Sequence, residues 1–183
     1  VARWAGRGFR IVAPLHDVRD GSIVNVQARR IVDTQPKTMS PKGSVVAGTC
    51  FANAEGVRLL RAEQTERRPV LVCEGLTDTL AACAAVGDEF PVLGTTGVGN
   101  ASRCVSTWAI DAVVFVATDL DEAGERVVRD VADAAYEHGA KDVRRLLWPE
   151  PAGDACDALR LLGAEALAEF LERVVVDDAE DSR

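Results

Sequence analysis

Acidic side chains gather where two apolar runs of this sequence end. Asp119 and Asp121 follow the run VVFVAT, and Glu74 and Asp78 follow the run VLVC. An apolar run that ends in an acidic turn and leads into a helical pattern is typical of a buried parallel strand, and α/β proteins bind ligands at the carboxyl ends of such strands. Several carboxylates at one sheet edge repel one another, and divalent cations with oxygen ligands relieve that repulsion. The residues therefore predict a metal site.

A third acidic segment, GDACDAL, adds Asp154 and Asp157 as candidate ligands. Asp119 and Asp121 are the first choice, with Asp154 or Asp157 completing the site. Structural roles without a metal stay open for two of these motifs. An isolated Asp-x-Asp after a strand is more often a helix N-cap in a solvated turn. Asp78 is explained equally well by a water-mediated metal contact and by the dipole of a helix N-terminus.

The elements that must position these groups alternate between strand and helix. Strands are predicted at 70–73, 91–94, 112–118 and 143–147, and helices at 77–86, 101–108, 122–138, 154–162 and 164–174. This alternation predicts an α/β fold, a doubly wound and mainly parallel four-stranded sheet with flanking helices.

The first part of the chain has a different pattern. Residues 9–33 read as a hairpin with its turn at Asp20 and Gly21, residues 34–48 as a loop, and TCFAN as a short strand before a helix. We therefore expect a small α+β subdomain over 1–68, a catalytic domain over 69–175 and an acidic, disordered tail over 176–183.

The charge of the chain is unevenly distributed. Residues 1–69 carry a net charge of +6 and residues 70–183 a net charge of −14, which together give the overall −8. A basic segment beside an acidic one suits a protein that holds a polyanion with one surface and divalent cations with the other, although ordinary solvated surfaces would also account for it. The residues that we expect to touch a nucleic-acid template or a nucleotide are Arg29, Arg30, Lys37 and Lys42.

Composition excludes several classes. No apolar run approaches the roughly 20 residues that cross a bilayer, and the start lacks the apolar core of a signal peptide, so we expect a cytoplasmic protein without a membrane partner. The five cysteines form no CxxC pair and predict neither a disulfide framework nor a structural zinc site. The first residue is Val, which suggests a piece of a longer protein.

The order of these motifs resembles the Toprim domain of DNA primases. Glu74 in VCEGLTD, the pair in ATDLDEAG and the closing GDACDAL carry the resemblance over roughly 69–160. FRIVAPLHDVRDGSIVNVQARRI, PKTMSPKG and CFAN look like the primase subdomain that precedes Toprim, in bacterial primases and in the cores of phage-type primase-helicases. Gly153 departs from the phage-type pattern, which usually has Lys there.

The resemblance implies a DNA-directed primase, a nucleotidyltransferase that makes RNA primers on single-stranded DNA from nucleoside triphosphates during DNA replication. It implies an acid/base role for Glu74, which could instead bind metal, and nucleotide or template contacts for Arg29 and Lys37. Carboxylates holding two Mg²⁺ or Mn²⁺ ions would supply the chemistry. A replicative helicase and a zinc-binding module would come from another segment or chain, because this sequence has no GxxxxGK[ST] and no zinc motif.

Other functions remain. A Toprim nuclease would use the same metals with water as the attacking group, and a Toprim module could bind nucleic acid without catalysis. A topoisomerase needs a tyrosine nucleophile, and the sole tyrosine, Tyr136, lies in a predicted helix away from the acidic turns. Thr95 and Thr96 could hold a phosphate or form a simple turn between glycines. Trp4, Trp108 and Trp148 could stack on nucleic-acid bases, although buried packing is the commoner role of tryptophan.

Overall fold

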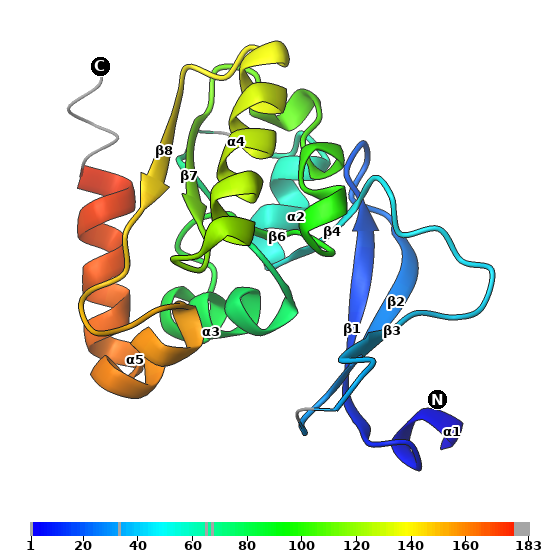
Figure 1. Ribbon diagram of the computed structural model, residues 1–183. Helices are drawn as coiled ribbons and strands as arrows, with labels where there is room; N and C mark the ends of the chain where they lie inside the picture. Colours follow the sequence, from blue (N-terminus) through cyan, green and yellow to red (C-terminus); the bar gives the residue numbers. More distant parts are fainter. Residues whose placement is uncertain (1, 33, 65, 67, 178–183) are drawn as a thin grey trace.

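A single sheet runs through the computed structural model, which describes residues 2–32, 34–64, 66 and 68–177 (Figure 1). The strands are β1 (Phe9–Asp17), β2 (Ile23–Arg30), β3 (Thr38–Met39), β4 (Thr49–Ala52), β5 (Val70–Cys73), β6 (Val92–Gly94), β7 (Val113–Ala117) and β8 (Asp142–Leu146). The helices are α1 (Ala2–Ala5), α2 (Ala54–Leu60), α3 (Leu76–Val86), α4 (Glu122–Glu137) and α5 (Ala155–Glu172). The eight strands lie in the order β3-β2-β1-β4-β6-β5-β7-β8.

The four strands β6, β5, β7 and β8 are parallel, as predicted. Helix α4 packs on one face of this part of the sheet, where Val127 and Val131 join Val114 and Val116 in a buried cluster. Helices α3 and α5 pack on the other face. Figure 1 shows α4 and α5 on opposite sides of β8. The sheet is therefore doubly wound.

Burial on both faces explains the apolar runs of the sequence. All four residues of β5 are buried, and so are the last four residues of β7. Phe115 of β7 is 1% exposed, and replacing a buried phenylalanine by alanine costs about 3–5 kcal/mol. A strand without a solvated face must be apolar throughout. The alternation of apolar and polar residues that is typical of half-exposed strands is therefore absent here.

The N-terminal strands join this sheet through β4. Strand β4 pairs antiparallel with β1 on one side, at His16 and Asp17, and antiparallel with β6 on the other. Leu15 of β1, Phe51 of β4 and Leu76 of α3 form a buried cluster at the junction. The hairpin formed by β1 and β2, which we call the basic hairpin, is thus continuous with the parallel sheet in hydrogen bonding and in packing.

Two predictions of local structure were wrong. The predicted helix at 101–108 is a series of short 3₁₀ turns, with Ser102–Cys104 and Thr107–Ala109 separated by an extended Val105. Tertiary bonds explain the difference: the Ser106 hydroxyl donates to the Val18 carbonyl at 2.6 Å and the Cys104 thiol to the Thr49 carbonyl at 3.2 Å. The predicted loop at 34–48 contains the two-residue strand β3, which pairs with β2.

The C-terminal helices follow the prediction. Helix α5 has a kink at Gly163, where φ is 79°, between the two helices that the sequence predicts. A helical turn continues over Arg173–Asp177, two residues into the predicted tail, and the rest of that tail, 178–183, lies outside the described residues. Within the described ranges, no helix is both long and apolar enough to cross a membrane.

Candidate active site

A cleft of about 390 Å³ lies between the basic hairpin and the carboxyl ends of β5, β6 and β7. We call it the acidic cleft. Four carboxylates and two basic residues are among its lining residues: Glu74, Asp78, Asp119, Asp154, Arg29 and Lys37. The sequence predicted all six as site residues, and the topology brings them together from well-separated segments of the chain.

The turn between β5 and α3 presents two of the carboxylates. Glu74 directly follows β5, and Asp78 lies in the first turn of α3, whose N-cap is Gly75. The side chain of Thr95 is fully buried and donates its hydroxyl to the Glu74 carbonyl. Thr95 therefore fixes the turn that carries Glu74, which favours a structural role for this threonine over a phosphate contact. The Thr96 hydroxyl lies 3.4 Å from the Val46 carbonyl, a long contact.

The turn between β7 and α4 presents Asp119 and Asp121 differently. Asp119 lines the cleft, whereas Asp121 is exposed and caps α4 by accepting a hydrogen bond from the Gly124 backbone at 2.8 Å. A Cβ at Gly124 would lie 2.1 Å from the Asp119 carbonyl oxygen, so only glycine permits this tight turn. Arg145 of β8 donates to the same carbonyl at 3.3 Å and pairs with Glu125 of α4. Arg145 thus holds the turn from the neighbouring strand.

The N-terminus of α5 presents the third acidic segment. Asp154 is the N-cap and accepts from the Asp157 backbone at 2.6 Å. The Asp157 side chain is exposed and pairs with Arg160 at 2.9 Å, and it is not among the residues that line the acidic cleft. Between them, the Cys156 sulfur and one carboxylate oxygen each of Asp78 and Asp154 lie within 4.8 Å of one another.

Burial and mutual repulsion disfavour the charged form of these carboxyls. Burial, followed by the charges of Asp154, Asp119 and Glu74, raises the pKa of Asp78 to about 7. Burial and the charge of Asp119 raise the pKa of Glu74 above its usual range. Burial and the charge of Asp154 do the same for the pKa of Asp119. A cation in the cleft would oppose both effects and stabilise the charged form of these carboxyls.

The donor set fits a divalent cation. Glu74 Oε2 and Asp78 Oδ1 are buried oxygens that have no hydrogen-bond partner among the described residues. Buried acceptors without a donor are costly, and a hard cation satisfies them directly. The residues that would hold it are Glu74, Asp78, Asp119 and Asp154, with Asp121 and Asp157 on the adjoining helix termini.

The basic residues divide into two groups. Arg29 of β2 and Lys37 just before β3 line the acidic cleft, whereas Arg30 and Lys42 do not. Arg30 lies 4.7 Å over the ring of Phe9 and donates to the Gln35 carbonyl at 2.8 Å, which ties down the edge of the hairpin. Lys42 lies exposed in the loop after β3. Gln27, a buried neighbour of Arg29 that also lines the cleft, was not predicted as a site residue.

The aromatic candidates lie elsewhere. Trp108 and Trp148 are each 4% exposed, which confirms the expectation of buried packing for both, and Trp4 lies in α1. Tyr136 is near the far end of α4, about 21 Å along the helix axis from its first residue at the acidic turn. A tyrosine nucleophile at the carboxylates is therefore absent from the described residues.

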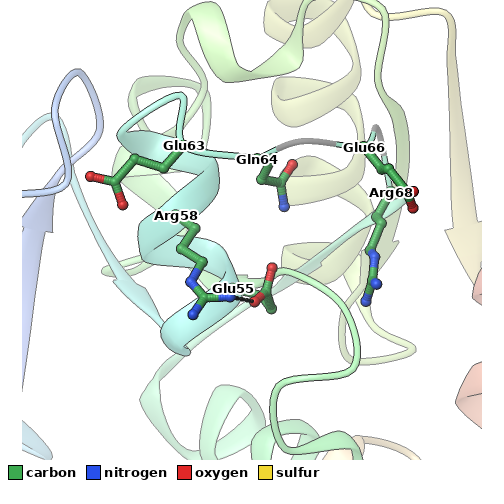
Figure 2. Close-up of a pocket in the computed structure, with 6 residues that line it drawn as sticks. All are labelled: Glu55, Arg58, Glu63, Gln64, Glu66 and Arg68. Atoms are coloured by element: carbon green, nitrogen blue, oxygen red, sulfur yellow. Dashed lines mark hydrogen bonds and ion pairs between the residues drawn. The ribbon is translucent and has the colours of Figure 1, made fainter.

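A second cavity, of about 270 Å³, opens beside α2 (Figure 2). Its lining mixes both signs of charge: Glu55, Arg58, Glu63, Gln64, Glu66 and Arg68. Arg58 pairs with Glu55 at 2.7 Å, and Arg68 donates to the Glu89 carbonyl. Both arginines of this cavity are therefore engaged by neighbouring groups.

The chain resembles known proteins in part of its sequence and in its fold. Residues 71–159 match the Toprim-like family model. No curated protein sequence matches the chain. Among solved structures, the primase fragment of the bacteriophage T7 primase-helicase superposes with a TM-score of 0.61 at 23% identity, over 89% of this chain and 62% of that one.

Bacterial primases give the same result. The E. coli primase catalytic core has a TM-score of 0.59 at 20% identity, over 90% of this chain and 52% of that one. The zinc-binding and RNA polymerase domains of the Aquifex aeolicus primase have a TM-score of 0.57 at 21% identity, over 94% and 44%. The chain thus has the fold of DNA primase catalytic cores and spans less than two thirds of each of these three structures.

Proposed function

We propose that this chain is a DNA primase catalytic core, which joins ribonucleotides into a primer on single-stranded DNA with Mg²⁺ or Mn²⁺. The observation that carries the proposal is the acidic cleft, where Glu74, Asp119 and their neighbours face Arg29 of β2 and Lys37 just before β3. Carboxylates that hold cations and basic side chains that hold phosphates are the two needs of nucleotidyl transfer. The Toprim-like match and the primase fold support it.

Each residue has a part in this reaction. The cations, two in number by our proposal, would neutralise phosphate charge and favour ionisation of the attacking 3′ hydroxyl. Asp119, Asp121 and the Asp154 segment hold them. Glu74, half-buried and with a raised pKa, is suited to accept the hydroxyl proton. Arg29 and Lys37 contact the triphosphate or the template backbone.

We further propose a division of tasks along the chain. Residues 1–68 hold template and nucleotide, and residues 69–175 hold the cations. A replicative helicase and a zinc-binding module would work with this core from another segment or chain. Two relatives support this, since one is a primase-helicase protein and another includes a zinc-binding domain.

The test is incorporation of labelled ribonucleotides on single-stranded DNA with Mg²⁺ or Mn²⁺. We expect extension products from the wild type and a loss of at least a hundredfold in Glu74→Gln, because proton transfer contributes about 10²–10⁴ in rate. Glu137→Gln, the same change at the exposed end of α4, is the matched control. Degradation of the DNA without triphosphates would instead identify a nuclease, and binding without either reaction a non-catalytic module.

The basic residues give a second readout. Arg29→Ala or Lys37→Ala should weaken nucleotide or template binding about 10- to 150-fold, since a lost charge-assisted hydrogen bond costs about 1.5–3 kcal/mol. Lys42→Ala, outside the cleft, should have a smaller effect. The binding should also weaken steeply with salt. Equal effects of all three substitutions would show that general positive charge, and not this cleft, holds the nucleic acid.

A further inference from the structure

Cys156 places a sulfur atom beside Asp78 and Asp154, two carboxylates that line the acidic cleft. It lies in the first turn of α5, two residues after the N-cap Asp154, and it faces Asp78 in the first turn of α3. The Cys156 sulfur lies within 4.8 Å of a carboxylate oxygen of Asp78. The helix N-termini that carry the three groups therefore meet at one point.

The packing of α3 against α5 holds this point in place. Ala81 and Ala82 of α3 and Ala155 and Ala158 of α5 are all 4% exposed or less and belong to one buried cluster. Small side chains let the two helices approach closely. Rigid helix ends of this kind position ligand atoms better than loops do.

The ligand atoms are nearly close enough to share an ion. The sulfur and the two carboxylate oxygens lie within 4.8 Å of one another, and in a tetrahedral zinc site such atoms are about 3.4–3.6 Å apart, as bond lengths of about 2.0–2.3 Å require. Small side-chain rotations close the difference. Asp78 Oδ1, buried and without a partner among the described residues, is available for the contact.

We propose that Asp78, Asp154 and Cys156 form a mixed sulfur and oxygen subsite that binds Zn²⁺ in preference to Mg²⁺. Thiolate ligands select Zn²⁺ and similar ions, whereas Mg²⁺ requires oxygen ligands. On binding, the thiol releases its proton to water, and sulfur bonds to the ion as thiolate. The part of the inference that concerns activity rests on the proposed function: Zn²⁺ occupies two carboxylates that Mg²⁺ would use, so it inhibits primer synthesis.

The other thiols of the chain offer a control. Cys50, Cys73 and Cys104 are buried, and Cys83 of α3 is half-buried like Cys156. Cys83 is not part of the cluster with Asp78 and Asp154. Cys83→Ser therefore removes a thiol of similar exposure from the protein without touching the subsite.

The experiment is a titration of the metal-free protein with Cd²⁺, a spectroscopic probe for Zn²⁺, without DNA or nucleotides. We expect ultraviolet thiolate-to-metal absorption that saturates at one equivalent in the wild type and in Cys83→Ser. Cys156→Ser should lose this band, and Zn²⁺, but not Mg²⁺ at a hundredfold excess, should displace Cd²⁺ from the wild type. An unchanged band in Cys156→Ser, or no band in the wild type, would overturn the proposal.

A second measurement needs no substitution. Zn²⁺ should protect Cys156 of the wild type from alkylation at least tenfold, as measured by mass spectrometry of the peptide, and leave Cys83 unprotected. Equal alkylation of Cys156 with and without Zn²⁺ would also overturn the proposal. Because neither measurement involves synthesis, a protein that binds Cd²⁺ through Cys156 and makes no primer contradicts the proposed function alone.

Discussion

Replacing Asp78 by asparagine should stabilise the metal-free protein at alkaline pH. The ordinary pKa of this carboxyl is 3.8, and burial with three neighbouring carboxylates raises it to about 7 in the folded state. A raised folded-state pKa gives stability that is fully present below pH 3.8 and is lost as the pH rises through about 7. Asparagine does not titrate, so the stability of the Asp78→Asn protein lacks this contribution to the pH dependence.

The size of the effect follows from the two pKa values. Between pH 5 and pH 8 the wild type should lose about 2.5 kcal/mol more stability than Asp78→Asn, by linkage. Water in the open cleft reduces this figure, so it is an upper bound. Since 1 kcal/mol corresponds to about 2–4 °C in a protein of this size, the melting temperatures should diverge by about 5–10 °C at most.

The assay is thermal unfolding followed by circular dichroism in EDTA at pH 5, 6, 7 and 8. Asp130→Asn, on the exposed surface of α4, makes the same chemical change away from the cleft and should follow the wild type. Adding Mg²⁺ at pH 8 should raise the melting temperature of the wild type more than that of Asp78→Asn. Parallel pH curves for Asp78→Asn and the wild type would refute the claim that burial of the Asp78 carboxylate, with repulsion from its neighbours, opposes folding.

Three further substitutions test how the site is held. Arg145→Ala should weaken Mn²⁺ binding about fivefold, because the Asp119 turn loses its support from β8. Electron paramagnetic resonance measures this binding. The control, Arg144→Ala on the same strand, should leave Mn²⁺ binding unchanged. Gly124→Ala should lower stability to urea by about 2 kcal/mol or more, because its Cβ meets the Asp119 carbonyl, and a neutral result would mean that the turn relaxes freely. Asn53→Ala should lower the free energy of unfolding in urea by about 2 kcal/mol, since Asn53 caps α2 and also bonds to the backbone of β6. A loss below about 0.5 kcal/mol, which is small for a cap, would contradict this.

The strands that carry the site could be predicted because they are buried on both faces. Continuous apolar residues marked β5 at its observed bounds and β7 to within one residue at each end. Strand β3 could not be predicted, because two residues carry no pattern and their pairing depends on β2. The 3₁₀ segment was mistaken for a helix because the bonds of Ser106 and Cys104 to distant carbonyls leave no trace in local sequence.

The candidate site could be predicted in its members more than in its arrangement. The position of each carboxylate after a strand was enough to select Glu74 and Asp119. It did not reveal that Asp121 and Asp154 each use one oxygen to cap a helix, although a cap was the open alternative for Asp121. The spacing of the cysteines to one another did not indicate Cys156 as a ligand. Its position in the sequence between Asp154 and Asp157 could have done so.

The placement of β4 decides how the chain tolerates being cut. A fragment that starts at residue 69 would keep every cleft carboxylate but would expose the backbone groups of Leu93 and Gly94 that β4 covers, and Leu76 would lose Leu15 and Phe51. Uncovered strand edges recruit other chains. Such a fragment should self-associate. The proposed boundary near residue 68 therefore lies within one continuous sheet and does not mark a place where the protein can be divided.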